Sequence, residues 1–139
     1  DSWIGTPAWP DYGEYVPPHT AATSRRLAAG APAIHFGTGT AALLEVMREA
    51  GGDVIGLDWR VDLGAAWDRL GPEVAVQGNL DPAILLAPTD EIRRAARAIL
   101  DGAARRPGHV FNLGHGVHAE TPVDHVRALV DMVHEMSAR

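Results

Sequence analysis

Four short apolar segments, each followed by a stretch with helical spacing, constrain the fold of this chain more than any other feature. The segments cover residues 32–36, 53–58, 74–78 and 109–113, and glycine or proline bounds each of them. Apolar runs of this length are typical of strands that are buried on both faces. Strands that alternate with helices favour a parallel sheet joined by right-handed crossovers.

The predicted helices carry recognisable start and stop signals. We expect helices over 40–50, 62–70, 89–105 and from Thr121 onward, and an earlier one over 11–29 that Pro17 and Pro18 disturb. Asp62 is the expected N-cap of the second of these helices, and Thr121 is the expected N-cap of the last. No linker divides the chain. The sequence therefore predicts one α/β domain over 1–139, with a helix followed by four βα units and no internal boundary.

Size and charge exclude several classes of protein. The chain has 139 residues, 46% of them hydrophobic, and a formal net charge of −6. No apolar run approaches the ~18 residues that a membrane span needs, so we expect no membrane partner. An acidic chain without a basic cluster is a poor nucleic-acid binder.

Two residue types are absent from the sequence. There is no cysteine, and there is no lysine, because all 12 basic residues are arginine. This composition excludes thiolate nucleophiles, cysteine-based metal sites and Schiff-base chemistry within these residues. Oxygen groups and 7 histidines remain as candidate functional groups.

Polar residues gather at the predicted carboxyl ends of the strands, where parallel sheets place their functional groups. The ends comprise residues 35–39, 56–60, 77–82 and 112–116. His115 lies between two glycines that let the imidazole reach a ligand. Asp58 and Arg60 suggest either an internal ion pair with a packed Trp59 or a ligand contact. For Asp81 we expect a turn-capping role.

The residues from Gly37 to Ala42 leave a second interpretation open. They fit the pattern G-x-G-x-x-A after a strand, and Asp58 follows at the distance of a ribose-binding carboxylate. This pattern would suit a dinucleotide-binding oxidoreductase. The alternative is a glycine-rich turn without a ligand. A metal site at His115 and His118 rests on only two histidines, and we predict no metal.

Taken together, the strand ends resemble one known family. Asp1-Ser2-Trp3, Ile34 to Gly37, Gly56 to Trp59, Gln77 to Pro82, and Phe111 to Gly116 are similar, in this order and spacing, to uroporphyrinogen decarboxylase. The resemblance covers the whole chain but only the C-terminal half of the family's protein. It implies that the chain is the second half of a (β/α)8 TIM barrel, since such barrels need ~250 residues.

The resemblance also implies a function. The family removes carbon dioxide from the four acetate side chains of uroporphyrinogen III to give coproporphyrinogen III in haem biosynthesis, without a cofactor or a metal. Ser2 and His115 match substrate-binding positions, and a hydroxyl or a protonated imidazole can donate to carboxylate oxygens. We expect Phe36, Gly37, Asp58 and Asn79 to line the same cleft.

Further expectations follow from the same resemblance. The family's catalytic Asp and its Arg-rich motif have no counterpart here, so we expect the missing N-terminal half as a partner and an inactive chain in isolation. A homodimer in the cytoplasm is expected. The resemblance weakens the dinucleotide hypothesis. A non-catalytic half-barrel that acts as an assembly module remains a further alternative, because four strands cut from a barrel have two open edges.

Overall fold

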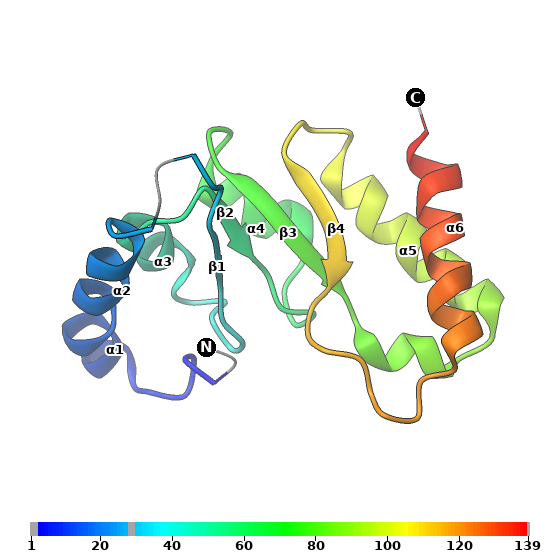
Figure 1. Cartoon of the computed structure of the whole chain (residues 1–139), viewed down its shortest axis with the longest axis horizontal. Helices are drawn as coiled ribbons and strands as arrows, with labels where there is room; N and C mark the ends of the chain where they lie inside the picture. The colour runs from blue at the N-terminus through cyan, green and yellow to red at the C-terminus, as the bar shows by residue number, and fades with distance from the viewer. Residues whose placement is uncertain (1–2, 28–29, 139) are drawn as a thin grey trace.

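The computed structural model describes residues 3–27 and 30–138. In chain order the elements are α1 (Trp9–Tyr15), α2 (Pro17–Ser24), β1 (Ile34–Phe36), α3 (Leu44–Ala50), β2 (Val54–Gly56), α4 (Leu63–Leu70), β3 (Ala75–Leu80), the short 3₁₀ helix η1 (Pro82–Leu86), α5 (Thr89–Ala103), β4 (His109–Leu113) and α6 (Val123–Ser137) (Figure 1). The predicted α/β class and the strand–helix alternation are confirmed.

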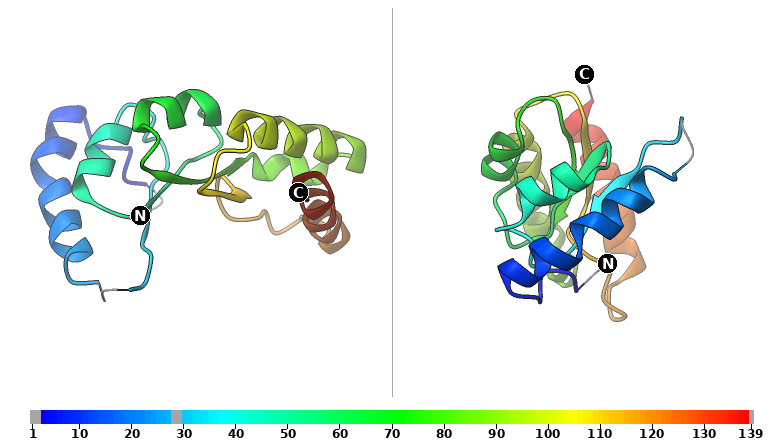
Figure 2. Two further views of the ribbon diagram at one scale, coloured as in Figure 1. Left: turned by 90° about the horizontal axis from the view of Figure 1, so that it is seen from above. Right: turned by 90° about the vertical axis from the view of Figure 1, so that its left-hand side faces the viewer.

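The four strands form one parallel sheet in the order β1-β2-β3-β4. Each strand therefore pairs with the next strand in the chain, as in a (β/α)8 barrel. A doubly wound dinucleotide fold would instead reverse its strand order at one point. Seen from above, the helices follow an arc around one side of the curved sheet and leave the other side open (Figure 2). This arrangement is that of half a barrel.

The strand register separates the sheet into an inner and an outer face. Phe36 is paired with Gly56, and Gly56 with Gln77, in neighbouring strands. Residues paired in this way point to the same side of a parallel sheet, and this row lies on the inner face. The Phe36 ring lies directly over Gly56, where an added Cβ would be only 2.8 Å from its Cδ2 atom. Gly56 thus makes room for the phenylalanine.

The outer face carries the hydrophobic core. Ile55 and Val76, which alternate with the inner row, are fully buried under the helices. Trp67 of α4 is 2% exposed, and its Nε1 donates a hydrogen bond of 2.8 Å to the Val74 carbonyl. A second cluster joins α5 and α6 to β3, with Ile92 completely buried. Burial of such side chains contributes roughly 1.5–3 kcal/mol each and holds the helices on this face only.

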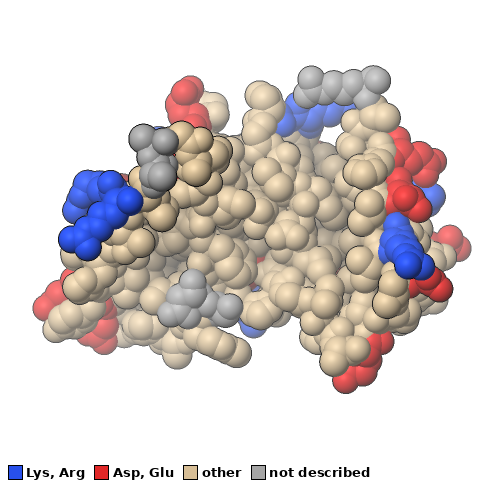
Figure 3. Space-filling view, viewed as in Figure 1, with Lys and Arg blue, Asp and Glu red and all other residues tan. Residues whose placement is uncertain are grey.

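The inner face is open and nearly uncharged. Ile34 and Val110 are 49% and 44% exposed although both are apolar strand residues. In the view of Figure 3, which looks onto this side, charged residues lie around the rim of the molecule and uncharged residues fill most of the centre. Exposed apolar residues on one face of a sheet mark a surface that other protein segments can cover.

Several predicted boundaries were wrong. The helix expected over 11–29 is two helices, because Pro17 and Pro18 lack the N–H groups that would continue α1. Val16 ends the first helix and caps the second. The helix expected from Thr40 begins only at Leu44. The third strand extends to Leu80, which places Asn79 within the sheet rather than after it.

The cap predictions had mixed outcomes. Asp62 caps α4 as expected, with its Oδ1 accepting a hydrogen bond of 2.8 Å from the Ala65 N–H. Thr121 is not the N-cap of α6, since that position belongs to Pro122. The proline already supplies a fixed φ angle and needs no donor at the helix start. Among the residues that the structure describes, no helix has the length and apolar character to cross a membrane.

Candidate functional site

Asp58 joins the loops that follow the first two strands. Its side chain is 2% exposed, and its Oδ2 accepts hydrogen bonds from the Gly39 N–H at 2.7 Å and from Arg60 Nη1 at 3.0 Å. The Oδ1 atom accepts from the Arg60 N–H at 3.0 Å. Of the two alternatives for Asp58 and Arg60, the structure shows the internal ion pair. Both oxygens of this carboxylate are engaged inside the protein, so Asp58 acts as an anchor of the site.

This geometry also decides between the two interpretations of Gly37 to Ala42. A ribose-binding carboxylate must offer its oxygens to a ligand. Asp58 offers them instead to the glycine-rich turn itself, and the strand order lacks a switch point. The turn is therefore held by Asp58, and these observations argue against a dinucleotide site.

The carboxyl ends of β3 and β4 also contact the loop that contains Asp58. This loop and the groups bonded to it form the supporting network of the site. The Nδ2 atom of Asn79 donates to the carbonyls of Asp58 and Val61, both at 2.8 Å, while its buried Oδ1 has no partner among the described residues. Gly114 donates from its N–H to the Leu80 carbonyl at 2.8 Å. A Cβ at Gly114 would lie 2.3 Å from the Trp59 nitrogen. Only glycine allows the two loops to approach so closely.

A hollow of about 420 Å³ opens beside this network, at the carboxyl edge of the sheet. Phe36 and Gln77 form its floor, and Asn112 and His115 contribute polar groups to its wall. The Nδ1 atom of His115 accepts a hydrogen bond of 2.7 Å from the Gly116 N–H. A neutral imidazole with this bond carries its proton on Nε2, which leaves one donor for a ligand.

The bond to Gly116 bears on which nitrogen of His115 can donate to a ligand. A protonated imidazole donates from both nitrogens, so Nδ1 could not accept from a backbone N–H at the same time. The contact to the Gly116 N–H favours the tautomer in which Nδ1 accepts and Nε2 donates. A neutral N–H still binds a carboxylate oxygen as a charge-assisted hydrogen bond.

The predicted site residues fall into two groups, those that line the hollow and those buried behind it. Phe36 and His115 line the hollow, whereas Gly37, Asp58 and Asn79 are buried in the supporting network. Ser2 lies outside the described residues. Gln77 and Asn112 line the hollow but were not selected from the sequence. Their signal was the strand register, which places Gln77 on the same face as Phe36.

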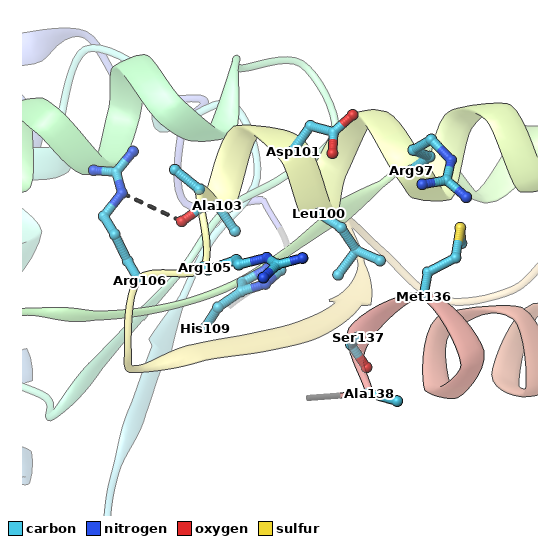
Figure 4. Close-up of a pocket in the computed structure, with 11 residues that line it drawn as sticks. Arg97, Leu100, Asp101, Ala103, Arg105, Arg106, His109, Met136, Ser137 and Ala138 are labelled. Atoms are coloured by element: carbon cyan, nitrogen blue, oxygen red, sulfur yellow. Dashed lines mark hydrogen bonds between the residues drawn. The ribbon is translucent and has the colours of Figure 1, made fainter.

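A larger hollow, of about 520 Å³, lies at the opposite, amino end of the strands, between the last turns of α5 and α6. In Figure 4, Arg97 and Arg105 extend toward this space. His109 lies at its edge, and burial lowers the pKa of its imidazole despite the hydrogen bond to the Gly78 carbonyl. Arg106 packs over Trp67 at 4.7 Å and is paired with Asp68. Barrels place stabilising groups at this end.

Metal ligation has no geometric support in residues 3–27 and 30–138. No three histidine or carboxylate side chains of this part of the chain come together as a metal site would require. The groups that line the carboxyl-edge hollow include the imidazole of His115, the amides of Gln77 and Asn112, and the aromatic ring of Phe36.

The fold and the carboxyl-edge hollow define the class of protein, namely a chain with the strand order of a (β/α)8 barrel and its polar groups at the carboxyl ends of the strands. Within that class, the uroporphyrinogen decarboxylase (URO-D) family matches residues 1–136, and the chain belongs to this family.

Individual relatives give the same result. The chain is 56% identical over 137 residues to uroporphyrinogen decarboxylase of Sorangium cellulosum (strain So ce56), which covers 98% of this chain. It is 51% identical over 139 residues to the protein of the same name from Carboxydothermus hydrogenoformans, which covers 99% of the chain. The chain spans 39% and 40% of the lengths of these two relatives. The resemblance inferred from the strand-end motifs is confirmed.

Proposed function

We propose that this chain supplies four βα units, and one wall of the substrate cleft, to a uroporphyrinogen decarboxylase. The reaction removes carbon dioxide from each acetate side chain of uroporphyrinogen III and leaves a methyl group, which yields coproporphyrinogen III. The observation that carries this proposal is the hollow at the carboxyl edge with His115 in its wall, in a chain of this family.

His115 and Ser2 are the proposed substrate contacts. The Nε2–H of His115 suits a carboxylate oxygen of the porphyrinogen, and the hydroxyl of Ser2 suits a second one. Phe36 offers an apolar floor for the macrocycle, while Gly37, Asp58 and Asn79 hold the strand ends in place. No step in this assignment uses a metal or a cofactor.

In this proposal, the catalytic Asp and the arginines that bind the substrate lie in the part of the family's protein that this chain does not cover. Among the described residues, those that line the hollow include no arginine and no carboxylate, whereas the substrate carries eight carboxylates. A polyanion needs arginines in its cleft. We therefore assign the catalytic Asp and the Arg-rich motif to an N-terminal half that completes the barrel, and the 139 residues alone should be inactive.

A chimaera tests this proposal directly. Residues 1–139 would replace the matching segment of the Sorangium cellulosum relative, to which they are 56% identical. We expect coproporphyrinogen to form from uroporphyrinogen at a rate near that of the unmodified relative, with His115→Ala raising KM by roughly tenfold, the loss of one charge-assisted hydrogen bond. Porphyrin products would be separated by chromatography after oxidation.

The controls separate folding from function. The His115→Gln chimaera keeps an amide N–H donor and should retain more substrate affinity than His115→Ala. A folded chimaera that leaves uroporphyrinogen unchanged would contradict the proposed function. An unchanged KM in the His115→Ala chimaera would contradict the role of His115.

Partners and location follow from the same proposal. We propose that the open edges of β1 and β4 pair with strands of the missing half, and that the complete enzyme is a homodimer in the cytoplasm. A non-catalytic half-barrel that only assembles with other chains would leave the polar lining of the hollow without a use. The chimaera assay distinguishes these two outcomes.

A further inference from the structure

The orientation of His115 depends on a loop that is distant in the sequence. Its ring meets the Trp59 indole edge to face, with ring centroids 6.0 Å apart and an interplanar angle of 85°. The residue before it, Gly114, lies against the Trp59 backbone, where a Cβ would approach the nitrogen to 2.3 Å. Two separate contacts therefore fix the loop after β4 to the loop after β2.

Trp59 is itself held in place by its neighbours. The Arg60 guanidinium carbon lies 4.0 Å from the centroid of the Trp59 ring, which is a cation–π contact. The same guanidinium is paired with Asp58 at 3.0 Å, and Asp58 is 2% exposed. The buried carboxylate thus orients the arginine, the arginine covers the indole, and the indole meets the imidazole.

The contact to Trp59 complements the hydrogen bond that selects the tautomer. Gly116 fixes which nitrogen of His115 carries the proton, but this bond comes from the next residue and moves with the loop. The indole is the contact that ties the ring to the rest of the sheet. Without the indole, the ring is free to rotate about χ1, which directs Nε2 away from the hollow and also breaks the bond between Nδ1 and the Gly116 N–H, so the tautomer is no longer selected.

We propose that Trp59, held by the Asp58–Arg60 ion pair, is the positioning residue for His115. It does not touch the substrate in this proposal. It keeps the imidazole at one angle, so that the Nε2–H donor points into the hollow before substrate arrives. This inference rests on the proposed function for the identity of the ligand, although the ring orientation can be measured without any ligand.

The test combines spectroscopy and kinetics on the full-length chimaera. In ¹⁵N-histidine-labelled protein, the His115 ring signals, identified with His115→Gln, report the tautomer. We expect the parent to show the Nε2–H form, and Trp59→Leu to show a mixture of both tautomers. The same variant should raise KM roughly three- to tenfold with kcat nearly unchanged, as the loss of one aromatic pair implies. Trp59→Phe should restore most of both readouts.

A second variant keeps the proposal testable if Trp59→Leu does not fold. Arg60→Gln alters a side chain that is 52% exposed; it keeps the Trp59 side chain but removes the cation that holds the indole. We expect it to change the ring signals and KM in the same direction but less. Trp9→Leu, at a position that is 60% exposed on α1, is the matched control and should change neither.

The outcomes distinguish this inference from the function on which it rests. If Trp59→Leu folds and leaves the His115 ring signals and KM as in the parent, the positioning role is wrong. If Trp59→Leu cannot be obtained, unchanged His115 ring signals and KM in Arg60→Gln would likewise show that the positioning role is wrong. If the parent chimaera has no decarboxylase activity, the proposed function fails, while the ring signals alone still decide the role of Trp59.

Discussion

At the scale of single residues, the site depends on polar atoms whose partners lie in neighbouring loops. The sequence left two roles open for Asp58, an ion pair with Arg60 or a ligand contact, and the structure shows the ion pair. Its bond to Gly39 could not be predicted, because it joins two loops that are 19 residues apart. The contact between Trp59 and His115 is even more distant in the sequence. Local patterns identify chemical groups, whereas the register of the sheet decides which groups meet.

The half-buried histidine at the amino end of β4 makes stability depend on pH. Burial lowers the pKa of His109 below its ordinary value of 6.5. Between the folded and unfolded pKa values, the unfolded chain binds a proton that the folded chain does not. The free energy of unfolding therefore falls as pH decreases below about 6.5. Urea unfolding at pH 8 and pH 5 measures this effect.

Two variants isolate the contribution of His109. His109→Gln can still donate an N–H to the Gly78 carbonyl but does not titrate, so it should lose part of the pH dependence. His118→Gln, in an exposed loop, should retain it. Equal pH dependence in His109→Gln and in the parent chain would show that His109 does not contribute.

At the scale of secondary-structure elements, the sequence predicted existence better than boundaries. All four strands and the helices that follow them are present, because apolar periodicity reports burial directly. The misplaced boundaries lie where local signals compete, as at Pro17, which ends one helix and begins the next. The short helix η1 was missed because Asp81 caps a turn of only a few residues.

The cap of α4 offers a quantitative test at this scale. Asp62→Ala removes the acceptor of the Ala65 N–H and should lower the free energy of unfolding by about 1 kcal/mol. Asp62→Asn keeps an oxygen at the same place and should cost much less. Urea denaturation followed by circular dichroism compares the three proteins. If the alanine variant is as stable as the asparagine variant, the hydrogen bond contributes nothing.

At the scale of the whole molecule, the arc of helices leaves one face and two edges of the sheet uncovered. The strand-end motifs indicated half of a barrel, and the strand order confirms that arrangement. The exposure of the inner face could not be predicted from the sequence, because Ile34 and Val110 have the apolar side chains of ordinary core residues. Their exposure becomes visible only when the sheet is assembled.

The open edges predict how the 139-residue chain behaves alone. We expect it to self-associate and to bind a hydrophobic dye, because unpaired strand edges and exposed apolar side chains favour association. Val110→Lys should reduce both effects, whereas Val123→Lys, on α6 and 65% exposed, should change them less. Light scattering provides the measurement. A monodisperse species of 14.8 kDa would contradict this prediction.

The consecutive order of the strands has a consequence for biosynthesis. Each of β2, β3 and β4 finds its hydrogen-bonding partner in the strand made immediately before it, and the two are separated by one helix, or by η1 and α5 in the case of β3 and β4. Contacts of short sequence separation form quickly because little loop entropy is lost. A nascent chain of this topology can therefore add one βα unit at a time as it leaves the ribosome, without waiting for its last residues.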